Sequence, residues 1–113
     1  GKNLPVAHCI KDTDGWQIRR ELEELRTTEA IDKITFGAKE LPDILKKEAD
    51  IESITFVGLC TDICVISTVM RVKAFFPEIL VFVDARGCAG VTPASHATAL
   101  EAMKAVQVTV INE

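Results

Sequence analysis

The sequence predicts an α/β protein with a parallel sheet that is covered by helices on both faces. Strand and helix patterns alternate through the later two thirds of the 113 residues, which is typical of parallel strands joined by crossover helices. The predicted strands at 54–57 and 79–83 are almost wholly apolar. Strands of this composition are expected where both faces of a sheet are buried.

Residues 53–76 are the centre of the chain and predict a strand, a tight turn and a helix. The apolar run at 54–57 is rich in β-branched and aromatic residues, and Gly58 ends it. Thr61 and Asp62 are both good N-cap residues. Apolar side chains then recur at helical spacing, namely Val65, Ile66, Val69, Met70 and Val72. Ligands of parallel α/β proteins bind at such turns, beyond the carboxyl ends of the strands.

The other predicted elements follow from shorter patterns. Pro42 fits the helix predicted at 38–48 only in its first turn, and Thr92-Pro93 predicts a helix start as a cap followed by an N1 proline. The complete set is helices at 17–26, 38–48 and 92–105, a weak strand at 30–35, strands at 79–83 and 107–111, and a loop at 84–90.

Composition excludes several classes of protein. With 48% hydrophobic residues the chain can bury a core, and its length allows at most one domain. The net charge of −4 and the lack of a basic block argue against a nucleic-acid binder. No apolar run is long enough to span a membrane. The four cysteines have no zinc-ribbon or thioredoxin-type spacing, which indicates free thiols in a reducing, cytoplasmic compartment.

Cys64 is the first candidate for chemistry. It is expected in the first turn of the central helix, where unpaired N–H groups and the helix dipole favour an anion. A thiolate is therefore favoured over a thiol, and the thiolate is the reactive form. The same N–H groups could hold a developing oxyanion. The alternative is that Cys64 is a small buried hydrophobic residue.

The segment 58–65, GLCTDICV, resembles the nucleophile motif of the isochorismatase-like cysteine hydrolases, the superfamily that includes nicotinamidases. The resemblance implies that Cys64 is the nucleophile, that the peptide bond before Cys60 is cis, and that the backbone N–H groups of Cys60 and Cys64 form an oxyanion hole. Many relatives have Ala at the position of Cys60, which should be tolerated because that role belongs to the backbone. The stretch 84–96, DARGCAGVTPASH, also resembles the superfamily.

The resemblance extends to Lys33, which is followed three residues later by Phe36. In the superfamily a lysine in this pattern is the second member of an Asp–Lys–Cys triad, where it supports the thiolate. On its own, Lys33 would be an ordinary surface charge. Many nicotinamidases have a tryptophan that stacks on the pyridine ring, but this chain has Pro5 there. Phe36 or Trp16 could supply the stacking in a substrate pocket.

His8, His96 and Cys88 are three further residues that could take part in a site. His8 resembles a histidine that binds a metal in some nicotinamidase-like members. The resemblance implies that the complete protein could hold zinc or another divalent metal. The alternative is that His8 is a hydrogen-bonded loop histidine. The Asp-x-His pair that accompanies this ligand is absent from the sequence. His96 is expected to be a solvated histidine on the last helix. Cys88 is expected after a strand end, at the rim of the pocket.

The resemblance covers residues 8–111 but not a whole family domain. It implies a three-layer α/β/α, Rossmann-like fold whose amino-terminal strands, including the strand with the catalytic aspartate, lie outside these 113 residues. Residues 1–113 are therefore expected to be a partial hydrolase domain, a fragment with an incomplete triad. The resulting gap would expose apolar faces and unpaired strand edges, so we expect homo-oligomers.

These observations predict a cysteine hydrolase that acts on a small amide, with nicotinamide as the first candidate. Cys64 would attack the carbonyl carbon, an acyl-enzyme would form, and water would complete the hydrolysis. Two alternatives remain open. One is a non-catalytic binding or interaction protein on the same fold, and the other is a redox thiol protein that uses Cys60 and Cys64.

Overall fold

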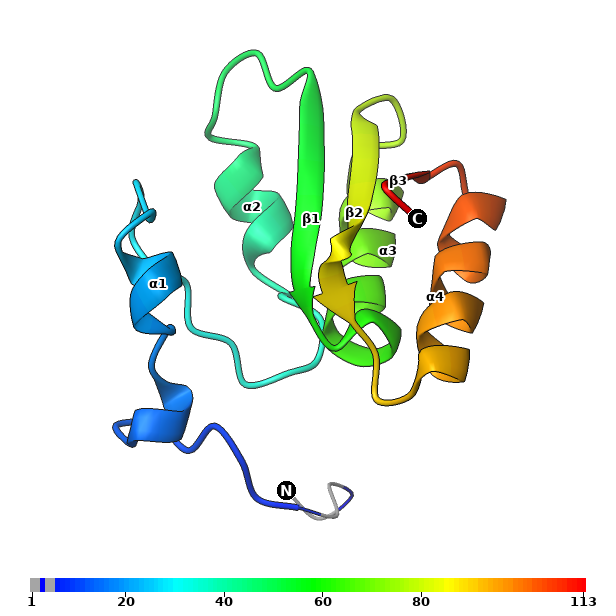
Figure 1. Ribbon diagram of the computed structural model, residues 1–113. Helices are drawn as coiled ribbons and strands as arrows, with labels where there is room; N and C mark the ends of the chain where they lie inside the picture. Colours follow the sequence, from blue (N-terminus) through cyan, green and yellow to red (C-terminus); the bar gives the residue numbers. More distant parts are fainter. Residues whose placement is uncertain (1–2, 4–5) are drawn as a thin grey trace. The chain divides into compact units, whose positions relative to one another are not determined.

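The structure is a computed structural model, and it describes residue 3 and residues 6–113. The chain forms two compact units, Gly1–Ile31 and Asp32–Glu113, which are described separately. Figure 1 shows the order of their elements along the chain. Within the described residues, no helix has the length and apolar character needed to cross a membrane.

The described residues of the Gly1–Ile31 unit contain little regular structure. Its elements are a 3-10 turn, η1 (Asp14–Trp16), and a single helical turn, α1 (Arg20–Glu23). The helix predicted at 17–26 is thus much shorter than expected. Its apolar residues Ile18, Leu22 and Leu25 are 41%, 60% and 76% exposed, so no packing stabilises a longer helix.

The Asp32–Glu113 unit contains a parallel sheet of three strands in the order β1–β2–β3, which confirms the predicted α/β class. The strands are β1 (Ser53–Leu59), β2 (Leu80–Ala89) and β3 (Thr109–Ile111). The helices are α2 (Leu41–Leu45), α3 (Ile66–Phe75) and α4 (Pro93–Ala105). Pro42 lies in the first turn of α2, and Thr92 caps α4, both as predicted.

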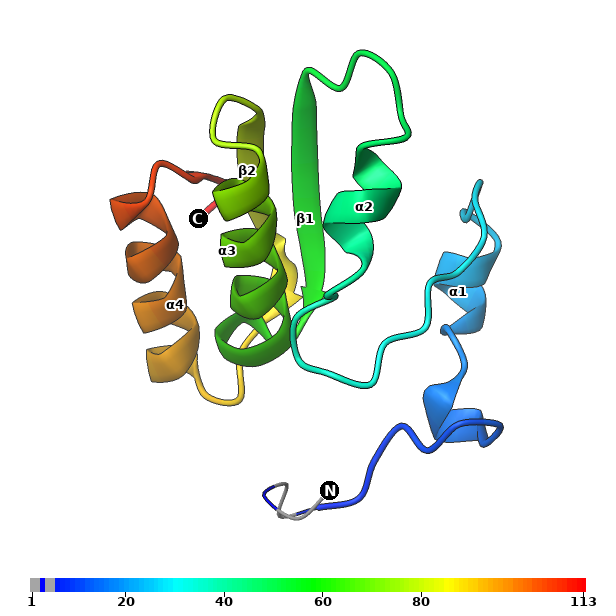
Figure 2. The ribbon, with the colours of Figure 1, turned by 180° about the vertical axis from the view of Figure 1, so that it is seen from behind.

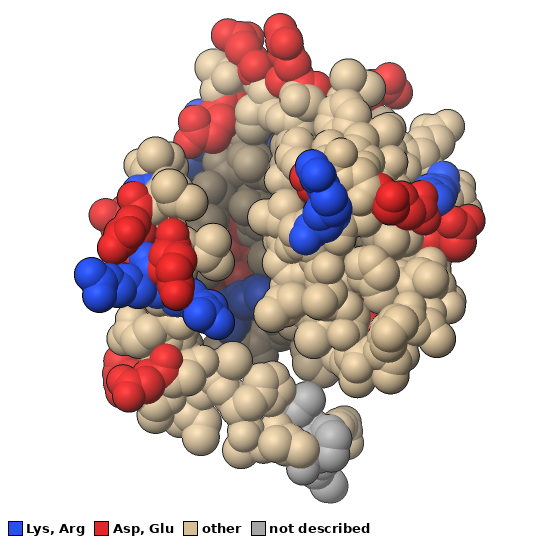
Figure 3. All heavy atoms as spheres, in the orientation of Figure 1, with Lys and Arg blue, Asp and Glu red and all other residues tan. Residues whose placement is uncertain are grey.

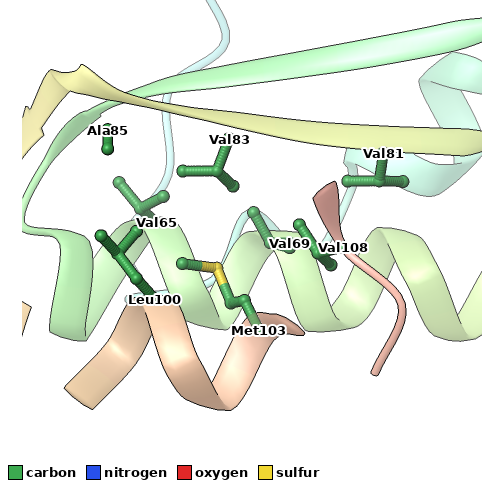
Figure 4. Packing of buried hydrophobic residues seen from close by; sticks show 8 residues of the cluster. All are labelled: Val65, Val69, Val81, Val83, Ala85, Leu100, Met103 and Val108. Carbon is green, nitrogen blue, oxygen red and sulfur yellow. The ribbon is translucent and has the colours of Figure 1, made fainter. Parts of the chain in front are cut away.

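The core lies between the sheet and the helices α3 and α4, which cover the same face of the sheet (Figures 1 and 2). Side chains from β2, α3 and α4 interdigitate there, as Figure 4 shows. The buried cluster consists of Val65, Val69, Val81, Val83, Ala85, Leu100, Met103 and Val108.

The opposite face of the sheet is exposed within residues 32–113, although the sequence predicted cover on both faces. Val57, Leu59 and Leu80 are 60%, 69% and 61% exposed. Figure 3 shows mostly uncharged atoms over this part of the molecule. The apolar run at 54–57 is therefore buried on one side only, where Phe56 packs against the core. The expected self-association stays a prediction.

The helix predicted at 38–48 is also shorter than expected, and two other predicted segments differ in kind from the structure. Residues 30–35 form no strand, and Ile34 is 96% exposed, so the alternation of apolar residues there is not matched by burial. Residues 84–89 are not a loop but the end of β2. The pairing with β1 changes register between Phe56 and Gly58, which pair with Val83 and Cys88. This bulge accommodates the polar and glycine residues that indicated a loop.

Candidate active site

The candidate site lies where the carboxyl ends of β1 and β2 meet. Leu59 at the end of β1 pairs with Ala89 at the end of β2. Just beyond these residues the chain turns into α3 on one side and α4 on the other, as Figure 1 shows at the arrowheads of the two strands. The parallel topology therefore brings the turn at residues 60–65 next to the start of α4, which is where such folds bind ligands.

Cys64 is the fourth residue of a π-helical turn, Thr61–Val65, that leads directly into α3. Cys60 is the N-cap, and its carbonyl oxygen accepts hydrogen bonds from the N–H groups of Ile63 and Val65, each at 3.1 Å. The prediction that Thr61 or Asp62 caps this helix is wrong. The Leu59–Cys60 peptide bond is cis, as the resemblance implied. Cys64 itself is half-buried.

The residues expected to be the caps instead join the turn to the start of α4. Thr61 is completely buried, and its Oγ1 lies 2.8 Å from Nδ1 of His96. The N–H of Val91 donates a hydrogen bond of 3.1 Å to Oδ1 of Asp62. His96 is thus half-buried and hydrogen-bonded, and its interpretation as a solvated histidine is wrong. Sequence reasoning missed it because its partner is 35 residues away.

Gly90 allows this close approach of the loop to α4. A Cβ on Gly90 would lie 2.8 Å from Cβ and 2.9 Å from Cα of His96. We predict that Gly90→Ala lowers the free energy of unfolding by about 1–3 kcal/mol, because helix backbone must move to relieve the overlap. Gly15→Ala is the matched control, since nothing lies within 4 Å of its Cβ position. Equal urea midpoints for the two variants would contradict the prediction.

A second set of contacts joins the turn to the segment that contains Lys33 and Phe36. The hydroxyl of Thr68 on α3 donates to the carbonyl oxygen of Cys64 at 2.8 Å and accepts from the N–H of Ala38 at 3.1 Å. Residues 37–38 are thereby fixed beside the first turns of this helix. Lys33 Nζ donates to the carbonyl oxygen of Thr35 at 2.9 Å, a bond within its own loop. Phe36 is 50% exposed.

The environments of the neighbouring cysteines favour the thiol form. Burial raises the pKa of Cys60, and the nearby Asp62 and Cys64 raise it further. Burial also raises the pKa of Cys88, which lies within β2 and packs against the core rather than on a loop. Neither cysteine is therefore in a setting that promotes nucleophilic attack.

Asp62 is held as a carboxylate. Hydrogen bonding from the Ser95 hydroxyl, followed by the N–H of Val91, lowers its pKa below the ordinary value of 3.8. A depressed pKa means that Asp62 stabilises the fold above pH 3.8, and that this contribution is lost as the pH falls through the lowered pKa. Thr61 and Asp62, which lie between Cys60 and Cys64, are thus both hydrogen-bonded to side chains of α4.

We predict a pH-dependent effect of Asp62→Asn on stability. The variant should unfold at lower urea than the wild type at pH 7, and the difference should shrink below pH 3.8. Glu78→Gln is the control, because Glu78 is an exposed carboxylate in the turn after α3. Urea midpoints measured across this pH range test the prediction. A difference for Asp62→Asn that stays constant down to pH 3 would show that its carboxylate has no special role.

His8 and Trp16 belong to the Gly1–Ile31 unit. His8 is exposed and its Nδ1 donates to the carbonyl oxygen of Val6 at 3.0 Å, which agrees with the hydrogen-bonded alternative. In the described part of the chain no group of three or more His, Cys, Asp and Glu side chains could hold a metal. His8 and the other described His, Cys, Asp and Glu side chains therefore do not fit a metal centre. Trp16 is half-buried. The stacking roles of Trp16 and Phe36 stay predictions. Pro5 lies outside the described residues.

Comparison with known proteins identifies the family. The sequence pattern of the isochorismatase domain matches residues 1–113. The chain belongs to the isochorismatase family. No curated protein sequence matched the chain.

Solved structures of isochorismatase-family proteins show the same fold. The chain is similar to the nicotinamidase of Staphylococcus aureus, at 25% identity and a TM-score of 0.79, over 92% of this chain and 70% of that one. It is also similar to a Bacillus subtilis nicotinamidase/pyrazinamidase, at 23% identity and a TM-score of 0.78, over 93% and 62% of the two chains. A third match is the Pyrococcus horikoshii pyrazinamidase in complex with zinc, at 21% identity and a TM-score of 0.74, over 95% and 62%.

The chain therefore spans about two thirds of the length of these isochorismatase-family structures. This agrees with the expectation that residues 1–113 correspond to part of a family domain. All of these matches share the fold of this chain.

Proposed function

We propose that residues 1–113 form the part of a cysteine hydrolase that contains the nucleophile, and that the substrate is a small amide, with nicotinamide as the first candidate. The observation that supports this most is the position of Cys64. It lies in the first turn after β1, at the carboxyl edge of the parallel sheet, in a chain whose whole length matches the isochorismatase family. The similarity to nicotinamidase structures supports the choice of nicotinamide.

In the proposed reaction the Cys64 thiolate attacks the amide carbonyl carbon. A C–S bond forms, and the electron pair of the carbonyl moves to its oxygen, which the N–H groups of Cys60 and Cys64 stabilise. The C–N bond then breaks, and the leaving nitrogen takes a proton and departs as ammonia. Water hydrolyses the thioester to the carboxylic acid and restores the thiol. Proton transfer needs a general acid–base, for which the family pattern uses an aspartate.

Lys33 has a supporting role in this proposal. Its ammonium group would stabilise the thiolate form of Cys64 by charge, as a cation near a cysteine does. In the present structure its hydrogen bond is with Thr35 in the same loop, so the proposed role requires a change of side-chain conformation. Three rotatable bonds beyond Cβ give the lysine that freedom.

The direct test is the release of ammonia from nicotinamide by protein that contains residues 1–113 together with the aspartate-bearing strand of the family domain, with nicotinic acid measured in the same samples. We expect equal amounts of the two products, at a rate proportional to protein concentration. Cys9→Ala, which removes an exposed cysteine of the other unit, should keep the wild-type rate. If such protein is folded and releases neither product, the proposed activity is ruled out.

A further inference from the structure

Thr61 and His96 form the most buried polar contact around the turn that contains Cys64. Thr61 is 0% exposed, and its Oγ1 and Nδ1 of His96 are 2.8 Å apart. A buried hydroxyl needs a hydrogen-bond partner, because burial without one is costly. His96 is the partner, and it comes from another helix, α4, 35 residues further along the chain.

The next residue, Asp62, is held both by the loop that leads into α4 and by α4 itself. Asp62 accepts the N–H of Val91, and the hydroxyl of Ser95 also interacts with its carboxylate. Ser95 is itself fixed by the capping box with Thr92 at the start of α4. Both residues between the N-cap Cys60 and Ile63 are therefore held by α4, and neither bond belongs to the helix that contains Cys64.

We infer that His96, acting through Thr61, is a positioning residue for the nucleophile Cys64. This inference rests on the proposed function of Cys64 and extends it. The N–H groups of a helix's first turn favour a thiolate only while that turn keeps its geometry. A turn fixed at Thr61 by a rigid helix keeps the backbone around Cys64 in one conformation, whereas a free turn frays. Small displacements of such supporting residues lower reactivity without contact with the substrate.

The contact from Thr68 to the carbonyl oxygen of Cys64 does not replace this role. It holds the carboxyl side of Cys64, from a residue of α3 itself. The bond to His96 holds the amino side, which is the side of the proposed oxyanion hole. Gly90 is part of the same arrangement, since a larger residue there would push against His96.

The test is the rate at which iodoacetamide alkylates Cys64, relative to the exposed Cys9 in the same molecules, measured by peptide mass spectrometry. Thr61→Val removes the hydroxyl but keeps the shape of the side chain, and His96→Ala removes its partner. We expect both variants to lower the ratio about fivefold, as for the loss of one buried hydrogen bond. Thr61→Ser keeps the hydroxyl, and His96→Asn keeps a polar atom near the position of Nδ1, so both should stay within about twofold of the wild type.

Thr98→Val is the control on the same helix, because the Thr98 hydroxyl bonds to Ala94 within α4. Circular dichroism checks that each variant is folded, and Thr61→Val alone decides the question if His96→Ala fails to fold. Wild-type ratios in Thr61→Val, or an equal loss in Thr61→Ser and Thr61→Val, would overturn the inference. Because alkylation requires no turnover, the role of His96 can hold even where nicotinamide is not hydrolysed, so the two proposals fail separately.

Discussion

Replacing Cys64 with alanine is expected to lower nicotinamide hydrolysis by at least about a thousandfold, which is the scale seen when a covalent nucleophile is removed. Without the thiolate no acyl-enzyme forms, and the remaining groups could only orient water. The measurement is ammonia release under saturating nicotinamide. Residual activity within tenfold of the wild type would show that Cys64 is not the nucleophile.

Cys60→Ala is the matched variant for this experiment. Cys60 is the N-cap of the same turn, but its proposed contribution is a backbone N–H, which alanine retains. We expect hydrolysis to stay within about tenfold of the wild type. A redox protein that uses Cys60 and Cys64 would lose its function in either variant.

Leu100→Ala is expected to lower the free energy of unfolding by about 2–5 kcal/mol, the usual range for a leucine deleted from a packed core. Leu100 lies on α4, is 2% exposed, and packs between α3 and the sheet, as Figure 4 shows. Urea unfolding should be followed by far-ultraviolet circular dichroism, which reports on α3 and α4. The fluorescence of Trp16, the only tryptophan, reports on the other unit.

Leu80→Ala is the control for the core variant. It removes the same atoms from β2, but Leu80 is 61% exposed on the open face of the sheet. We expect a loss below about 1 kcal/mol. A similar loss for both leucines would mean that the open face is packed in solution, and that the exposed apolar residues Val57 and Leu59 are covered by self-association or by another part of the protein.

The part of the fold near Cys64 could be predicted because local signals agree there. An apolar strand, a glycine and helical spacing follow one another at 54–72, and Thr92-Pro93 starts α4 where the cap and the proline indicate. The elements before residue 38 could not be predicted as well. The apolar residues at 17–35 recur at the spacing of a helix or a strand, but their side chains are exposed. Periodicity alone does not reveal whether another part of the protein buries such a face.

The position of Cys64 in the candidate site could be predicted from the sequence, but the contacts that support its turn could not. Cys64 could be placed from the helix that follows β1, a relation between neighbours in the sequence. The contacts of Thr61 with His96 and of Asp62 with Val91 join segments about 30 residues apart. The parallel order of β1 and β2 contains this information in principle, because it places the start of α4 beside the turn. Only the register of the strands and the bulge in β2 decide which residues meet.

The measurement that tests the central claim most directly is the rate at which iodoacetamide alkylates each of the four cysteines of the wild-type protein at neutral pH. Exposure alone predicts that Cys9 reacts first, since Cys60, Cys64 and Cys88 are all half-buried. We predict instead that Cys64 reacts first, because the first turn of its helix favours the thiolate. Alkylation of Cys9 first, with Cys64 as slow as Cys60 and Cys88, would contradict an activated nucleophile in this protein.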